Sequence, residues 1–172
     1  MFTQAKWTDL VFDLNIPPGK YPALVERLAG TPARLGEKMR NTPFLLLAQP
    51  YNNGWSIQQH VGHLLDLEEL ILRRLDDFET GKEVLTAADM TNLKTNTAGH
   101  NERDINTILK EFRISRMAIV KRMKQYDEAM VQRTVLHPRL NKPMSIAGLA
   151  YFFAEHDDHH LATISIIEKA LE

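Results

Sequence analysis

Residues 55–68 read WSIQQHVGHLLDLE, and this stretch predicts the start of an amphipathic helix. Ser56 is a good N-cap, and Gln59 occupies the Glu/Gln position of a capping box three residues later. Beyond this cap, apolar residues recur at helical spacing as far as Phe78. They are Ile57, Val61, Leu64, Leu65, Ile71, Leu72, Leu75 and Phe78. The pattern therefore predicts a helix over residues 57–78.

Three further helical patterns flank this one, and no stretch alternates convincingly like a strand. The first covers residues 22–39, where Gly30 and Pro32 predict a kink or a division into two shorter helices. The third covers residues 102–126, and the fourth begins after the N-cap candidate Ser145 and ends near Leu171. Residues 79–100 are polar and too long for a simple loop. The sequence thus predicts an all-α fold, a four-helix bundle with one long crossover between helices 2 and 3.

The length and composition are those of an ordinary soluble protein. The 172 residues predict a single domain over residues 1–172, with 44% hydrophobic and 25% charged residues. Lys and Arg number 21 against 22 Asp and Glu, which argues against a nucleic-acid partner. No apolar run approaches the ~20 residues of a membrane span, so we expect no membrane partner. Asp9 and Asp13 interrupt the N-terminal apolar pattern, which argues against a signal peptide and makes a cytoplasmic location the default expectation.

The chain has no Cys and 7 His. Without thiols, it has no disulfides, thiolate metal sites or Cys nucleophiles, so any transition metal must be bound by imidazoles and carboxylates. The HExxH, GxSxG, P-loop and GxGxxG motifs are also absent. No Glu stands three residues before a His, which argues against a ferritin-like di-iron centre.

Five of the seven histidines fall on two predicted helices, His60 and His63 on the second and His156, His159 and His160 on the fourth. His156 and His160 share one helix face with apolar residues, and this spacing chelates metals. Three neutral imidazoles and a water would form a catalytic type of zinc site. Spacing alone leaves open His60 or His63, and His159 or His160. The alternative is a core of water-bridged histidines without a metal.

Glu68 lies in a row of residues that should face the core, between Leu64 and Ile71. A buried glutamate needs a cation, a hydrogen-bond donor or a proton. A nearby metal or metal-bound water would satisfy it, and so would an ion pair with Arg113 or Arg116 of the third predicted helix. The sequence leaves these two interpretations open.

Four short motifs, taken in order, resemble the DinB-like (also YfiT-like) superfamily. They lie at residues 28–35, 55–68, 137–139 and 155–161, and the resemblance extends from about residue 10 to 170. The resemblance implies an up-down-down-up four-helix bundle with its long crossover between helices 2 and 3. It also implies a divalent metal ion, zinc first and nickel or iron as alternatives. The implied ligands are His63, His156 and His160, with His60 and His159 as neighbours, and family members are often homodimers.

Characterised relatives include metal-dependent transferases and isomerases that use a low-molecular-weight thiol, and proteins called metal-dependent hydrolases. The resemblance therefore implies an enzyme that acts on a small molecule by activating a thiol or a water. Because the chain has no Cys, such a thiol would have to be a cosubstrate. We expect Glu68 or Asp157 to orient a ligand imidazole. Arg113, Arg116 and Arg139 are candidates for binding the carboxylates of the thiol. The alternative function is a non-catalytic metal-binding bundle, active in stress response or as an interaction module.

Overall fold

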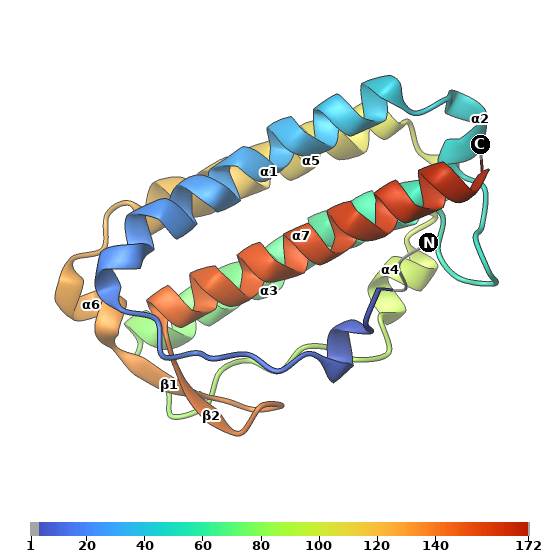
Figure 1. The fold of residues 1–172 in the computed structure, drawn as a ribbon. Coiled ribbons are helices and arrows are strands. Elements are labelled where there is room, and N and C mark those ends of the chain that lie inside the picture. Colours follow the sequence, from blue (N-terminus) through green and yellow to red (C-terminus); the bar gives the residue numbers. More distant parts are fainter. Residues whose placement is uncertain (1–3, 172) are drawn as a thin grey trace.

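Four long helices form the body of the molecule in the computed structural model, which describes residues 4–171. They are α1 (Tyr21–Asn41), α3 (Ile57–Glu79), α5 (Ile105–Met123) and α7 (Ile146–Leu171). Helices α1 and α3 each pack against both α5 and α7. The colours of Figure 1 show that α1 and α7 run in one direction and that α3 and α5 run in the other. The predicted up-down-down-up bundle, with its long crossover between α3 and α5, is confirmed.

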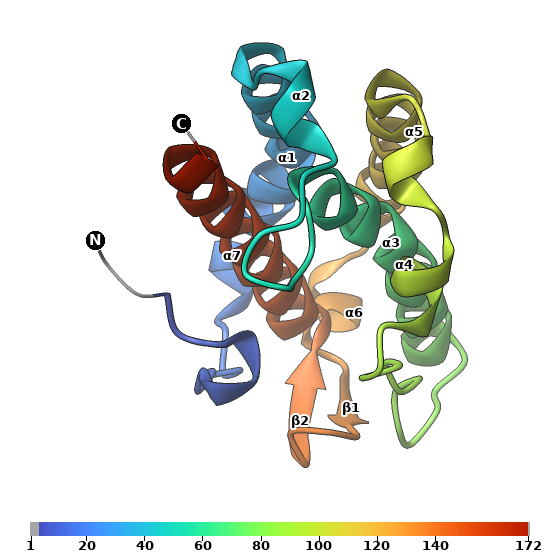
Figure 2. The ribbon, with the colours of Figure 1, turned by 90° about the vertical axis from the view of Figure 1, so that its right-hand side faces the viewer.

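Short elements connect these helices. They are η1 (Trp7–Asp9), η2 (Pro18–Lys20), α2 (Phe44–Leu47), α4 (Leu93–Thr97), η3 (His100–Glu102) and α6 (Glu128–Gln132). The crossover carries α4 along the side of α3, as the rotated view in Figure 2 shows. No helix in residues 4–171 is both long and apolar enough to cross a membrane.

A short β-hairpin, which the sequence pattern did not reveal, precedes α7 as a minor addition to the helical fold. Strands β1 (Thr134–His137) and β2 (Lys142–Ser145) pair antiparallel, with Val135 opposite Met144. Asn141, with a φ of 50°, supplies the left-handed residue in the connection. A parallel bridge between Val84 and Leu136 ties the crossover to this hairpin. Strands of four residues are too short for their alternation to stand out in the sequence.

Helix α1 passes through Pro32 without dividing, so of the two alternatives, a kink or a pair of shorter helices, the second is wrong. Proline has no N–H, and the carbonyl of Leu28, four residues earlier, therefore lacks its helical donor. Arg116 of α5 donates from Nη1 to that carbonyl at 3.4 Å. The neighbouring helix thus supplies a hydrogen bond that the proline removes.

The helix starts follow the expected capping chemistry. The Ser56 hydroxyl accepts from the Gln59 backbone N–H at 3.1 Å, and Gln59 Oε1 accepts from the Ser56 backbone N–H at 3.0 Å. Ser145 Oγ accepts from the backbone N–H of Gly148 at 3.0 Å. Helix α5 is shorter than the predicted 102–126, because Asp104 caps it and Ile105 is its first residue.

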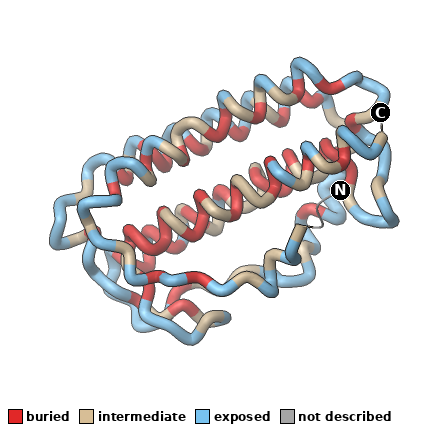
Figure 3. The backbone as a smooth tube through the Cα atoms, in the orientation of Figure 1, coloured by how far each residue is buried: buried red, intermediate tan, exposed pale blue. Residues whose placement is uncertain are grey.

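Buried residues, red in Figure 3, recur along the long helices and form two apolar clusters. One includes Leu28, Ile71, Ile119 and Ala154, and the other includes Leu35, Leu64, Phe112 and Leu161. On each helix a buried polar residue stands between the two: Thr31, Glu68, Arg116 and Asp157. We call the three ionic residues, Glu68, Arg116 and Asp157, the charged layer, and Thr31 joins it by a hydrogen bond to Asp157. It separates the two apolar clusters, and on α7 its residue Asp157 directly follows His156.

Candidate metal centre

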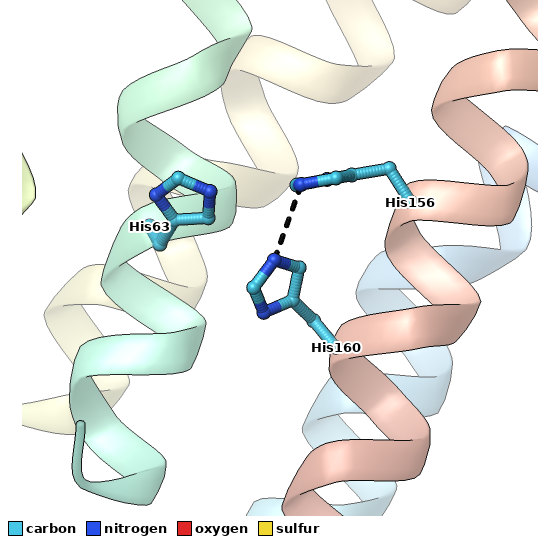
Figure 4. A group of neighbouring side chains, drawn as sticks. All are labelled: His63, His156 and His160. Atoms are coloured by element: carbon cyan, nitrogen blue, oxygen red, sulfur yellow. Dashed lines mark hydrogen bonds between the residues drawn. The ribbon is translucent and has the colours of Figure 1, made fainter. Parts of the chain in front are cut away.

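Helices α3 and α7 bring three buried imidazoles together (Figure 4). His63 comes from α3, and His156 and His160 come from successive turns of α7. One ring nitrogen of each lies within 4.8 Å of those of the other two. We call this set the histidine cluster. It contains the three residues implied by the family resemblance, and His60 and His159 are not part of it.

The two rings of α7 meet through Nε2 atoms that lie 3.2 Å apart. Two imidazole lone pairs at this distance repel each other unless a proton or a cation lies between them. Two nitrogen ligands at 2.0–2.1 Å from a tetrahedral zinc ion would be about 3.3–3.4 Å apart. The separation of His156 and His160 therefore fits chelation of one ion.

A hydrogen-bond chain from the crossover sets the tautomer of His63. The Thr95 hydroxyl donates to Asp66 Oδ2 at 2.9 Å, and it lies 3.0 Å from His63 Nδ1. Because the hydroxyl proton goes to the carboxylate, His63 Nδ1 must be the donor to Thr95. The lone pair of His63 is then on Nε2, the nitrogen that a metal ion would use.

His100 supports the same chain. Its Nε2 lies 2.8 Å from Asp66 Oδ2, and its ring packs on the backbone of Gly62. A Cβ atom at position 62 would lie 2.3 Å from His100 Cγ, so only glycine fits there. Sequence patterns did not single out Asp66, Thr95 or His100. The only signal was that Asp66 lies one helical turn after His63, because Thr95 and His100 fall in a segment without periodicity.

His60 and His159 lie beside the cluster. His60 Nδ1 is 2.9 Å from His160 Nδ1, so the two rings share one hydrogen bond. His159 is half-buried and its Nδ1 lies 3.0 Å from Gln4 Nε2. His60 is therefore placed to orient His160, whereas His159 contacts the N-terminal segment.

Burial keeps these rings neutral. It lowers the pKa of His63 and of His60 to about 4, and it lowers the pKa values of His156 and His160 well below the ordinary value. Metal ions bind the neutral imidazole. At neutral pH the cluster therefore presents unprotonated nitrogens without needing to release protons.

This burial predicts acid sensitivity of the metal-free protein. Below pH 6.5 the unfolded chain protonates these histidines while the folded chain does not, so stability falls as the pH falls toward 4. Each such ring contributes on the order of 2 kcal/mol of loss by pH 5. Burial raises the pKa of Glu68 to about 7, so its protonation stabilises the folded chain as the pH falls. This is one group against four histidines. Urea unfolding of chelator-treated protein at pH 7 and pH 5 measures the difference, and equal stability at both would contradict it.

The carboxylates expected to orient a ligand do not take that role. Glu68 Oε1 accepts from Arg116 Nη2 at 2.6 Å, and Asp157 Oδ2 accepts from Arg116 Nη1 at 2.5 Å and from the Thr31 hydroxyl at 2.7 Å. Within residues 4–171 neither carboxylate hydrogen-bonds an imidazole. The ion-pair interpretation of Glu68 is therefore correct, with Arg116 as the partner and Arg113 exposed.

A cavity of about 500 Å³ opens onto the histidine cluster. Trp55 packs beside His63, with ring centres 4.7 Å apart, and Trp7 packs edge-on against His156 at 4.9 Å. All three cluster histidines line the cavity, so a small molecule can reach them. A larger cavity of about 720 Å³ lies between residues 11–18 and the hairpin, and no histidine lines it.

Comparisons with known proteins agree with this architecture. Residues 23–164 match the model of the DinB superfamily. The structure is also similar to that of YfiT from Bacillus subtilis, with a TM-score of 0.82, 16% sequence identity, and coverage of 94% of this chain and 93% of that one. YfiT is described as a probable metal-dependent hydrolase with an unusual four-helix bundle topology. No curated protein matches the sequence. Because the family model covers most of its length, the chain belongs to the DinB superfamily.

Proposed function

We propose that this protein is a metal-dependent enzyme in which His63, His156 and His160 bind one divalent ion through their Nε2 atoms. The observation that carries the proposal is a set of three buried, neutral imidazoles converging at the wall of an open cavity. Three imidazole ligands are typical of catalytic zinc sites, which leave one position free. Zinc is the first candidate, with nickel or iron as alternatives. A sealed cluster would favour the non-catalytic alternative, and this one is accessible.

When bound, such an ion would act as a Lewis acid and would lower the pKa of a coordinated water or thiol. The chain's own residues hold the ligands for this chemistry. Asp66 and Thr95 fix the tautomer of His63, and the Nδ1 contact with His60 positions the ring of His160. The charged layer ties α3 to α7 through Arg116, which keeps the two ligand-bearing helices in register.

The reaction that we propose is attack by a water or a low-molecular-weight thiol on a small electrophile. This covers a hydrolase and a thiol S-transferase, and no Cys of the chain can serve as the nucleophile. Homodimer formation and a cytoplasmic location belong to the same proposal, and they stay predictions.

Activity tests the proposal. A panel of small esters, amides and alkyl halides, each with and without an added thiol, should show turnover with zinc-loaded protein. Chelation should abolish that turnover, and added zinc should restore it in the wild type but not in His156→Ala. Turnover that survives chelation, or that is equal in His156→Ala, would contradict metal dependence. A protein that binds the ion but turns over none of the panel would favour the non-catalytic alternative.

The hydrogen-bond chain to His63 makes a separate prediction. Replacing Thr95 by Val removes the acceptor for His63 Nδ1, and we expect metal affinity to fall roughly 10- to 100-fold. Competition with a chelator of known affinity measures the change. The matched control is Thr97→Val, on the same short helix but exposed, which should leave affinity unchanged. Equal affinities for the two variants would show that Thr95 does not orient the ligand.

A further inference from the structure

The cavity above the histidine cluster has a second polar end. It runs between α3 and α7, and its walls are largely apolar, with Trp7, Leu67, Leu70, Phe152 and Phe153. Arg74 of α3 lines it, as do His137 and Arg139 at the turn of the hairpin. Arg74 follows His63 by eleven residues on the same helix, so their Cα atoms are ~16 Å apart along the axis. The cavity therefore joins two distinct groups of polar side chains.

Arg74 is a buried cation that contacts no carboxylate directly among the described residues. Its side chain is only 2% exposed, and its Nε donates to the carbonyl of Thr86 at 3.0 Å. Within residues 4–171 no carboxylate forms an ion pair with it. Asp77, the acidic residue one turn away, is held by Lys82 and by the backbone N–H of Thr86. The Phe153 ring, 5.8 Å from the guanidinium, and Asp77, which acts without direct contact, compensate the Arg74 charge only in part, so an anionic ligand would stabilise it further.

Arg116 shows what a compensated arginine looks like in this fold. It is as deeply buried as Arg74, and two carboxylates surround it. It is therefore not available to a ligand, although its residue type made it a candidate. Burial lowers the pKa of Arg74 to about 10, which leaves its guanidinium charged at neutral pH.

His137 adds a donor to the same end of the cavity. Its Nδ1 accepts the backbone N–H of Leu140 at 3.2 Å, so the neutral ring carries its proton on Nε2. That Nε2 atom is buried and has no hydrogen-bond partner among the described residues. Arg139, two residues on, is exposed and pairs with no carboxylate in residues 4–171. Two guanidinium groups and one ring N–H thus line this end.

We propose that Arg74, with Arg139 and His137, binds a carboxylate of the substrate while the reactive group lies at the histidine cluster. The placement of the reactive group at the histidine cluster rests on the proposed function. With Nε engaged by Thr86, the Nη edge of Arg74 is left for a bidentate contact, which a carboxylate matches. The aromatic walls suit an apolar linker between the two ends. The substrate class is an elongated small organic acid with an apolar middle.

Binding of 4-phenylbutyrate and its neutral amide, 4-phenylbutyramide, tests the proposal by calorimetry. The acid should bind roughly tenfold or more tightly than the amide, because charge-assisted hydrogen bonds favour the anion. This preference should persist in chelator-treated protein, disappear in Arg74→Gln and remain in Arg113→Gln, an exposed control on α5. Metal content of Arg74→Gln should equal that of the wild type, which shows that the histidine cluster is intact.

Three results would overturn the proposal: equal binding of acid and amide, a preference unchanged in Arg74→Gln, or a preference lost on metal removal, which would place the carboxylate on the metal. Where Arg74→Gln does not fold, the exposed Arg139→Gln takes its place and should weaken the preference. The comparison of acid with amide in the wild type needs no variant. Because the acid and the amide are also compared in metal-free protein, the result for the carboxylate site does not depend on whether the protein is a metal-dependent enzyme.

Discussion

Replacing Arg116 by Met is expected to lower the free energy of unfolding by about 3–5 kcal/mol. Arg116 is fully buried and donates to Glu68 and Asp157, which come from α3 and α7. Removing its charge leaves two buried carboxylates without a cation, and methionine cannot replace the donor to the Leu28 carbonyl left free by Pro32. Urea unfolding at pH 7 measures the loss.

Two comparisons isolate the charge effect. Arg113→Met, exposed on the same helix, should change stability by no more than about 0.5 kcal/mol. The triple variant Glu68→Leu, Arg116→Met, Asp157→Leu should recover much of the loss, because removing a whole buried network costs far less than breaking it. A cost for Arg116→Met no larger than that for Arg113→Met would show that the charged layer does not hold the helices together.

Zinc is expected to stabilise the metal-free protein by about 4.1 kcal/mol when its free concentration is 1,000 times the dissociation constant. For a chain of this size, each kcal/mol corresponds to roughly 2–4 °C in melting temperature, so the expected increase is roughly 8–16 °C. The stabilisation arises because the folded chain holds the three imidazoles together, whereas the unfolded chain does not. Calorimetric melting with buffered zinc measures it.

The effect should depend on the cluster alone. His156→Ala and His160→Ala should each lose most of the increase, whereas Arg113→Met should keep it. An equal increase in His156→Ala and in the wild type would place the binding of zinc elsewhere on the protein.

Features set by neighbouring residues were predictable. Helix α3 begins at the predicted residue and ends one residue beyond the predicted end. Its cap and its apolar face are both local sequence patterns, which is why its bounds could be predicted. The burial of Arg116 could also be predicted, because it lies four residues after Phe112 and three before Ile119, on the buried apolar face of α5. The pairing of His156 with His160 likewise follows from helical spacing.

Features that depend on contacts between distant segments were not predictable from periodicity. His60 and His63 lie on neighbouring positions of one helix, and only the packing of α3 against α7 brings His63 to the cluster. Thr95 and His100 reach Asp66 because the crossover folds back on α3. The hairpin forms for the same kind of reason, because Leu136 bonds to the backbone at residues 83 and 85.

The metal content of untagged protein, measured by native mass spectrometry and elemental analysis, decides whether His63, His156 and His160 bind an ion. We expect one divalent ion per chain in the wild type and in His60→Ala, and none in His63→Ala, His156→Ala or His160→Ala. Retention of the ion in His63→Ala together with its loss in His60→Ala would contradict this expectation, as would a wild-type chain that binds no divalent metal.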